Sequence, residues 1–192
     1  MGEAGGGYRC IVADPPWEYD AFPTHIGGRY PKGRHAKAPM PYPTLSIDQI
    51  AQLPIQQLAH RDSHLFLWTT NRYLPDAFQI IEAWGFTYGQ AFVWVKSGTP
   101  TPFPAMLAPN HAEYMLACRR GRPARADTYP SNVIAAPMDR SMEHSQKPEV
   151  FMDIIEQVTH GPRIELFSRR ARLGWDTWGN ESLHGGTVVS AP

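Results

Sequence analysis

The chain of 192 residues has few cysteines, no long apolar run and no surplus of charge of either sign. Cys10 and Cys118 stand in apolar runs and match neither a disulfide framework nor a zinc spacing, so we expect a reducing compartment. Lys and Arg number 18, as do Asp and Glu, so net charge gives no argument for nucleic acid binding. No apolar stretch approaches the roughly 18 residues of a membrane-spanning helix, and no signal-peptide pattern appears. A soluble cytoplasmic protein without a membrane partner is expected.

Two ligand-binding patterns are also missing from the sequence. No G-x-G-x-x-G follows a predicted strand, and the one glycine cluster, Gly5-Gly6-Gly7, precedes the first strand. A dinucleotide-binding oxidoreductase is therefore the weaker alternative. The eight histidines form no H-E-x-x-H or Cys/His ligand pattern, so neither His111 nor His144 is a metal candidate and no metal is expected.

Strand-like and helix-like segments alternate along the chain. Apolar runs predict buried strands at 10–13, 64–69, 90–95, 113–118 and 163–167. Start signals at Ser46, Pro75 and Pro148 predict helices, the first through a capping box completed by Gln49. The alternation favours an α/β fold with a mostly parallel sheet and helices on both faces. We expect a single domain over 1–192, with flexible ends at 1–8 and 183–192.

Asp14-Pro15-Pro16-Trp17 directly follows the first predicted strand. The two prolines fix φ and donate no N–H, so this loop is stiff and keeps its carboxylate and carbonyls as free acceptors. Hydrogen-bond acceptors beside the flat apolar ring of Trp17 are suited to binding a planar base through its amino group. The alternative is a rigid turn with a packed tryptophan.

The chain resembles the adenine N(6)-methyltransferase family with the DPPW motif, the family of the messenger-RNA adenosine methyltransferase catalytic subunit, in its compact bacterial and phage form. The similarity runs from about residue 11 to residue 181. The matching segments, in chain order, are 14–17, 40–46, 65–68, 84–86, 94–96, 144–148, 165–169, 175 and 179–181. The resemblance implies a Rossmann-like methyltransferase fold in permuted order, S-adenosylmethionine as the methyl donor with S-adenosylhomocysteine as product, and no metal.

The resemblance also implies how the DPPW segment acts. The exocyclic amine of adenine is a poor nucleophile because its lone pair is delocalised into the ring. Hydrogen bonds from this amine to the Asp14 carboxylate and the Pro15 carbonyl would favour the state in which the lone pair is localised on nitrogen. Pro16 stiffens the loop, and Trp17 would stack on the base or wall it.

On the donor side, the resemblance places Lys147 near the methionine carboxylate and Asp14 in the same site. Asn180 and Glu181 would bind the ribose hydroxyls, with Ser168 and Arg169 beside them. Arg169 stands in a basic stretch with Arg163, Arg170 and Arg172. The simplest interpretation of this stretch is a solvated surface.

On the acceptor side, the resemblance indicates Tyr42, Lys96, Asn110 and Glu113. For Glu113 a second interpretation is open, in which its carboxylate is only a structural partner of Lys147.

Two loops combine several cations with no acid and are expected near the catalytic edge, where they would follow a phosphate backbone. Their cations are Arg29, Lys32, Arg34 and Lys37 in 25–43, and Arg119, Arg120, Arg122 and Arg125 in 119–125. A compact member without an appended RNA-binding module favours DNA over RNA as acceptor. An RNA adenosine methyltransferase and a non-catalytic nucleic-acid-binding subunit are the alternatives, and both a homodimer and a heterodimer are open.

Overall fold

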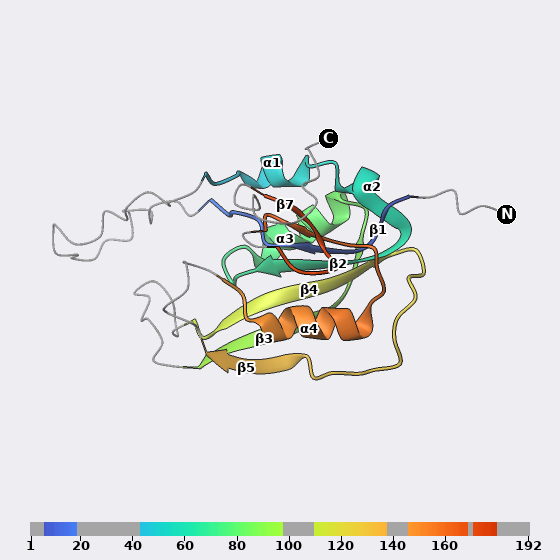
Figure 1. Ribbon diagram of the computed structural model, residues 1–192. Coiled ribbons are helices and arrows are strands. Elements are labelled where there is room, and N and C mark those ends of the chain that lie inside the picture. The colour runs from blue at the N-terminus through green and yellow to red at the C-terminus, as the bar shows by residue number, and fades with distance from the viewer. Residues whose placement is uncertain (1–5, 19–42, 98–109, 138–145, 169–170, 180–192) are drawn as a thin grey trace, which may run out of the picture.

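The computed structural model describes residues 6–18, 43–97, 110–137, 146–168 and 171–179, and it shows a central sheet with helices on both sides (Figure 1). The strands are β1 Tyr8–Ala13, β2 Ala59–Thr69, β3 Thr87–Ser97, β4 Ala112–Arg120, β5 Val133–Pro137, β6 Arg163–Leu166 and β7 Asp176–Trp178. The helices are α1 Ile47–Ala51, α2 Ile55–Leu58, α3 Leu74–Ala83 and α4 Glu149–Val158.

The seven strands form one sheet in the order β5-β3-β4-β2-β1-β6-β7. β4 is antiparallel to both of its neighbours, β2 and β3. All other neighbouring strands are parallel. The expected α/β fold with a mostly parallel sheet is confirmed.

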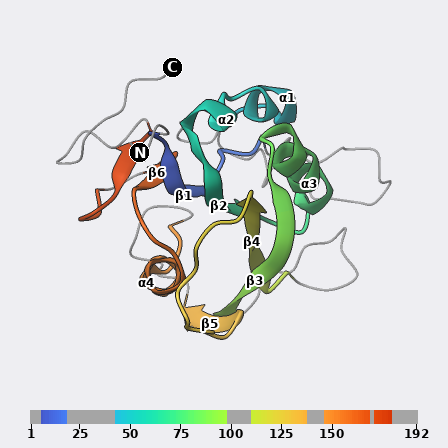
Figure 2. The ribbon, with the colours of Figure 1, turned by 90° about the vertical axis from the view of Figure 1, so that its right-hand side faces the viewer.

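Each face of the sheet has its own apolar core. Successive side chains of a strand point to opposite faces, so in β1 Ile11 joins one core and Val12 the other. The Ile11 core includes Ile80 and Trp84 from α3 and its end, whereas the Val12 core includes Phe151 from α4. Figure 2 shows α3 and α4 on opposite sides of the sheet. Helices on both faces are thus confirmed.

The helix start signals are confirmed at all three places. Ser46 caps α1 with the complete capping box, in which its side chain accepts from the Gln49 N–H. Pro75 stands in the first turn of α3, and Pro148 is the residue before the first turn of α4. Gly85 ends the α3 segment with φ 76°, a conformation that favours glycine.

Three short elements, one chain end and one position on a helix face differ from the sequence prediction. The sequence analysis missed α2, β5 and β7, since segments of three to five residues are too short to show a period. Tyr8 belongs to β1 and its hydroxyl donates to Asp176 at 2.7 Å, so placing residue 8 in a flexible end was wrong. On the predicted apolar face of α4, Val150 is exposed.

The expectation that the basic loop 119–125 lies near the catalytic edge is wrong. Because β4 is antiparallel to β2, Arg120 lies opposite Ser63 early in β2, and Tyr114 lies opposite Thr69 at its end. β4 therefore ends at the edge where β1 and β2 begin. In Figure 1 the segment after β4 runs along the right side, whereas the chain leaves β1 on the left.

Candidate active site

The DPPW segment and the segment that begins at Ser168 leave the sheet at the same edge. β1 and β6 are parallel neighbours, and Ala13 lies level with Leu166. Asp14 therefore follows β1 beside the point where the chain leaves β6. The carboxyl ends of parallel strands are where open α/β sheets bind ligands, so this edge is the candidate site.

Four charged side chains from distant parts of the sequence meet at this edge. The Lys147 ammonium lies 2.7 Å from Asp14 Oδ2 and 3.5 Å from Glu113 Oε2. Glu113 Oε1 in turn lies 2.5 Å from the Lys96 ammonium. Carboxylates and ammonium groups thus alternate in the order Asp14, Lys147, Glu113, Lys96, which we call the charge chain.

The charge chain is mostly shielded from water. The side chains of Glu113 and Lys147 are only 13% and 14% exposed, and that of Asp14 is 28% exposed. Burial raises the pKa of Glu113, but Lys147 and Lys96 together outweigh it and hold that pKa below its ordinary value. Glu113 is therefore an ionised carboxylate between two cations.

Two buried indoles lie under the cations of the charge chain. Lys147 Nζ is 5.4 Å from the ring centroid of Trp68, and Lys96 Nζ is 5.0 Å from that of Trp94. A cation over an aromatic face is attracted by the ring quadrupole. Neither tryptophan is predicted to have this role from the sequence. The spacing Trp94-Val95-Lys96 is a local signal for the second pair, whereas Lys147 is far from Trp68 in the chain and only the fold brings them together.

Trp17 does not have the position expected for stacking on a base. Its side chain is only 3% exposed and belongs to the core. The ring stacks on Tyr73, with centroids 5.0 Å apart and planes 13° apart. The base-stacking prediction is corrected for this structure: Tyr73 and the core cover the ring, as in the alternative of a packed tryptophan.

The backbone of the DPPW segment is held by its own turn and by the segment before α1. The Pro15 carbonyl accepts from the Trp17 N–H at 2.8 Å, and the Pro16 carbonyl accepts from the Leu45 N–H at 2.9 Å. A carbonyl oxygen has two lone pairs, so Pro15 retains acceptor capacity. The stiff loop that the prolines predict is present.

The turn after β6 is tightly built. Phe167 has φ 61°, a left-handed conformation that is costly for a bulky residue. Ser168 is buried, and its hydroxyl donates to Glu165 Oε2 at 3.0 Å. A Cβ at Gly179 would lie 2.6 Å from the Ser168 carbonyl oxygen, so only glycine fits there. The contact of Ser168 with the donor stays a prediction.

Asn110 lies at the start of β4 with a partner that the sequence analysis missed. Its Oδ1 accepts from Asn71 Nδ2 at 2.9 Å and from the Ala112 N–H at 3.3 Å. Asn71 follows the end of β2, and a polar residue just after a buried strand was the signal that could have revealed it.

Several predicted site residues lie outside the described part of the chain: Arg29, Lys32, Arg34, Lys37, Tyr42, Arg169, Asn180 and Glu181. Within the described ranges, no group of three or more His, Cys, Asp or Glu side chains could hold a metal ion. In the same ranges, no helix has the length and apolar character needed to cross a membrane.

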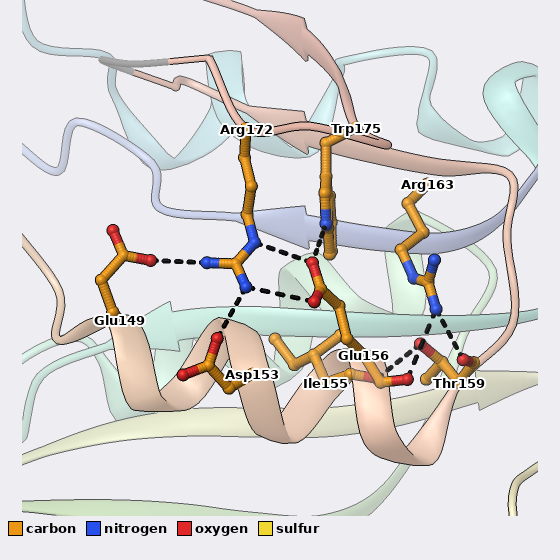
Figure 3. Close-up of polar contacts among 8 residues, drawn as sticks. All are labelled: Glu149, Asp153, Ile155, Glu156, Thr159, Arg163, Arg172 and Trp175. Atoms are coloured by element: carbon orange, nitrogen blue, oxygen red, sulfur yellow. Dashed lines mark hydrogen bonds and ion pairs between the residues drawn. The ribbon is translucent and has the colours of Figure 1, made fainter.

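Arg172 is part of an ion-pair network rather than of a solvated basic surface (Figure 3). Its guanidinium lies 2.6 Å from Glu149 Oε2, 2.6 Å from Asp153 Oδ1 and 2.7 Å from Glu156 Oε1. The three acids stand four and three residues apart, so they form one stripe along α4. Trp175 Nε1 also donates to Glu156.

Arg163 is likewise engaged at the other end of α4. Its guanidinium donates to the Thr159 carbonyl at 2.8 Å, just after the helix ends. The two arginines thus fasten α4 to the β6 and β7 segments. Because Lys147 immediately precedes α4, this network helps to fix the position of the charge chain.

A mostly parallel α/β sheet with charged residues at the carboxyl ends of its strands, in this arrangement, defines a Rossmann-like methyltransferase fold. The sequence matches MT-A70 over residues 8–181, so the chain belongs to the MT-A70 family of S-adenosylmethionine-dependent methyltransferases.

The chain is similar to three named proteins. It is 30% identical over 187 residues to the type II methyltransferase M.MunI of Mycoplasma sp, covering 91% of this chain and 77% of that protein. It is 30% identical over 193 residues to the human N(6)-adenine-specific methyltransferase METTL4, and this match covers 92% of this chain and 38% of that protein. It is 29% identical over 185 residues to the human N(6)-adenosine-methyltransferase catalytic subunit METTL3, and this match covers 92% of this chain and 28% of that protein. The chain thus spans most of the first protein and well under half of the other two.

The Arg172 network predicts a change in acid stability. The hydrogen bond from Arg172 is the main cause that lowers the pKa of Glu156. A lowered pKa stabilises the fold above about pH 4.5, the ordinary pKa of Glu, and this stabilisation is lost as pH falls through the lowered value. Arg172→Met should lower the free energy of unfolding by about 1–2 kcal/mol at pH 7, since the pairs are charged but partly exposed.

Urea unfolding of wild type and Arg172→Met from neutral pH down to pH 3 measures this effect. The difference between the two proteins should shrink below about pH 4.5. Arg61→Met is the matched control, because Arg61 is 87% exposed and, among the described residues, its ion pair is with Asp62. A constant difference at all pH values would contradict the role of Glu156.

Proposed function

We propose that this chain transfers the methyl group of S-adenosylmethionine to the exocyclic N(6) amine of adenine in nucleic acid, with DNA ahead of RNA as acceptor. The observation that carries the proposal is the charge chain, in which Lys147 bridges Asp14 of the DPPW segment and Glu113. Membership of a methyltransferase family supports the reaction class.

The residues of the candidate site fit the methyl donor. Its amino-acid end is a zwitterion, with a carboxylate and an ammonium group. Lys147 and Asp14 offer one charge of each sign 2.7 Å apart at the sheet edge. Lys147 would bind the carboxylate, where a compact cation is suited, and Asn180 and Glu181 would bind the ribose hydroxyls. When bound, S-adenosylmethionine supplies an electrophilic methyl group on a positively charged sulfur.

Asp14 and Pro15 would activate the acceptor amine. Each can accept one of its hydrogens, which favours the pyramidal amine with its lone pair on nitrogen. These hydrogen bonds strengthen as nitrogen becomes positive, so they stabilise the transition state more than the ground state. The buried Trp17 contributes by holding this loop against Tyr73 rather than by stacking on the base.

Glu113 and Lys96 would form the acceptor side of the site. They continue the charge chain on the side of Lys147 away from Asp14. Asn110, fixed by Asn71 at the same edge, would add an amide to this side. The pairing of Glu113 with Lys147 also supports the interpretation of Glu113 as a structural partner, and the two roles are compatible.

Similarity to a type II methyltransferase supports DNA ahead of RNA as the acceptor. Placement in the cytoplasm of a bacterial or phage-infected cell follows the same comparison. Both remain parts of the proposal.

Methyl transfer from labelled donor to matched DNA and RNA oligonucleotides, followed by nucleoside analysis, tests the function. We expect N(6)-methyladenine in the DNA. Label only in RNA would overturn the DNA preference, and donor binding without transfer to either acceptor would favour the non-catalytic alternative.

Asp14→Asn should reduce methyl transfer about 100- to 1000-fold, because it removes the negative charge of the group that accepts from the amine as positive charge develops on nitrogen. The protein should still fold, because Asp14 lies on a loop at the sheet edge. Glu18→Gln is the matched control, since this exposed carboxylate stands four residues further along, and it should leave the rate unchanged. Retention of more than about half of the activity in Asp14→Asn would contradict the assignment.

Lys147→Met should weaken donor binding. Loss of a hydrogen bond to a charged group is worth roughly 1.5–3 kcal/mol, which raises the Kd of the donor about ten- to a hundredfold. Lys96→Met is the control, because it removes the other cation of the charge chain and should raise the acceptor KM instead. Calorimetry and initial rates measure both constants. An unchanged donor Kd with a collapsed kcat would place Lys147 on the acceptor side.

A further inference from the structure

We infer that Arg119, Arg122 and Arg125, which we call the distal arginine cluster, bind the phosphate backbone of the acceptor nucleic acid at the edge opposite Asp14. This inference rests on the proposed function and extends it, because it adds a second contact surface outside the active site. The partner is identified by its chemistry, a chain of phosphodiesters.

The first observation is that these cations are exposed and form no ion pair with any described residue. Elsewhere in the described part of the chain, Lys96, Lys147, Arg61 and Arg172 pair with carboxylates. Arg120 and Arg163 donate to backbone carbonyls instead. The distal arginine cluster therefore carries positive charge that no carboxylate in the described part of the chain neutralises through an ion pair.

The second observation is that the backbone under the cluster is held in place. Gly121 has φ 63°, and a Cβ there would lie 2.3 Å from Asp62 Oδ1, so the turn after β4 requires glycine. The same Asp62 oxygen accepts from the Arg122 N–H at 2.8 Å.

Further along, the segment is tied to the end of α4. The Ala126 N–H donates to the Val158 carbonyl at 3.3 Å, and the Thr128 hydroxyl donates to the Gln157 carbonyl at 3.0 Å. A fixed backbone reduces the entropy lost when charged side chains on it bind a ligand.

The third observation is an exposed aromatic ring within the same segment. Tyr129 is 75% exposed, and the Arg125 guanidinium lies 4.9 Å from its ring centroid and donates to its hydroxyl. A flat cation beside an exposed ring is the combination on which bases of single strands stack. This chemistry favours nucleic acid over an acidic protein.

The spacing allows one acceptor to reach both surfaces. Glu113 and Arg119 are six residues apart on β4, and they lie about 20 Å apart along the strand. Met115 between them is buried in the core that includes Phe151 of α4, so an acceptor that reaches both residues must pass around the outside of the molecule and span more than this distance. At about 3.4 Å per nucleotide, the spacing of a stacked strand, about 20 Å corresponds to about six nucleotide steps, and to fewer steps of an extended strand. In 87–97 and 110–137 the acids are Asp127 and Glu113, and Glu113 is paired with two lysines. Asp62, which lies beside the cluster, is engaged by Arg61 and by the Arg122 N–H.

The test measures how wild type and the triple variant Arg119→Gln, Arg122→Gln, Arg125→Gln bind acceptors of two lengths. Single-stranded DNA of about three nucleotides with a central adenine is too short to reach Arg119 even when fully extended, whereas about 25 nucleotides are long enough. The variant should bind the long acceptor at least about tenfold more weakly. The slope of log K against log salt should fall by about 2, at about 0.7 per phosphate. Binding of the short acceptor and of the donor should be unchanged.

Two controls separate charge from folding. The triple Arg→Lys variant keeps the charge and should keep the wild-type salt slope, and Arg61→Gln, at the same edge but already paired with Asp62, should have little effect. If wild type methylates the short acceptor and the triple Gln variant binds the long one with the wild-type slope, this inference alone is overturned. If wild type binds neither donor nor acceptor, the proposed function fails first.

Discussion

The ion pair between Lys147 and Asp14 is the interaction on which the candidate site depends. An ammonium group that is 14% exposed needs a carboxylate partner, and Lys147 has two, since Glu113 also lies within 3.5 Å. Removing any member of the charge chain leaves an opposite charge unbalanced in a shielded place. A zwitterionic ligand, such as the proposed methyl donor, would replace contacts between groups that are already charged.

The helix after Lys147 connects this site to the stability of the whole fold. Phe151 of α4 packs on Trp68 with ring centroids 4.8 Å apart, and Trp68 lies beneath the Lys147 ammonium. On another side of the helix, Arg172 binds its row of acids. The position of Lys147 is therefore set by apolar packing and by ion pairs together.

Much of the architecture was predictable because its signals are local. The capping box at Ser46 and the proline before α4 act within one helical turn, and the apolar run before Asp14 forms β1 as expected. The structure brings together Asp14, Lys147, Glu113 and Lys96, which the resemblance indicates as site residues, and their roles in binding and catalysis stay predictions. Short elements such as β5 and β7 carry too few residues for a pattern, and they exist because a neighbouring strand offers hydrogen bonds.

By itself the sequence determined the stiff acidic loop after a buried strand, the helix starts and the family resemblance, because each rests on the chemistry of residues that are close in the chain. Only the tertiary structure decided that Trp17 is buried, since its neighbour Tyr73 comes from a distant segment. It also decided that Arg119 and its neighbours lie opposite the active site. The apolar pattern of a strand does not show whether the strand pairs parallel or antiparallel with its neighbours. For β4 this direction is seen only in its antiparallel pairing with β2 and β3.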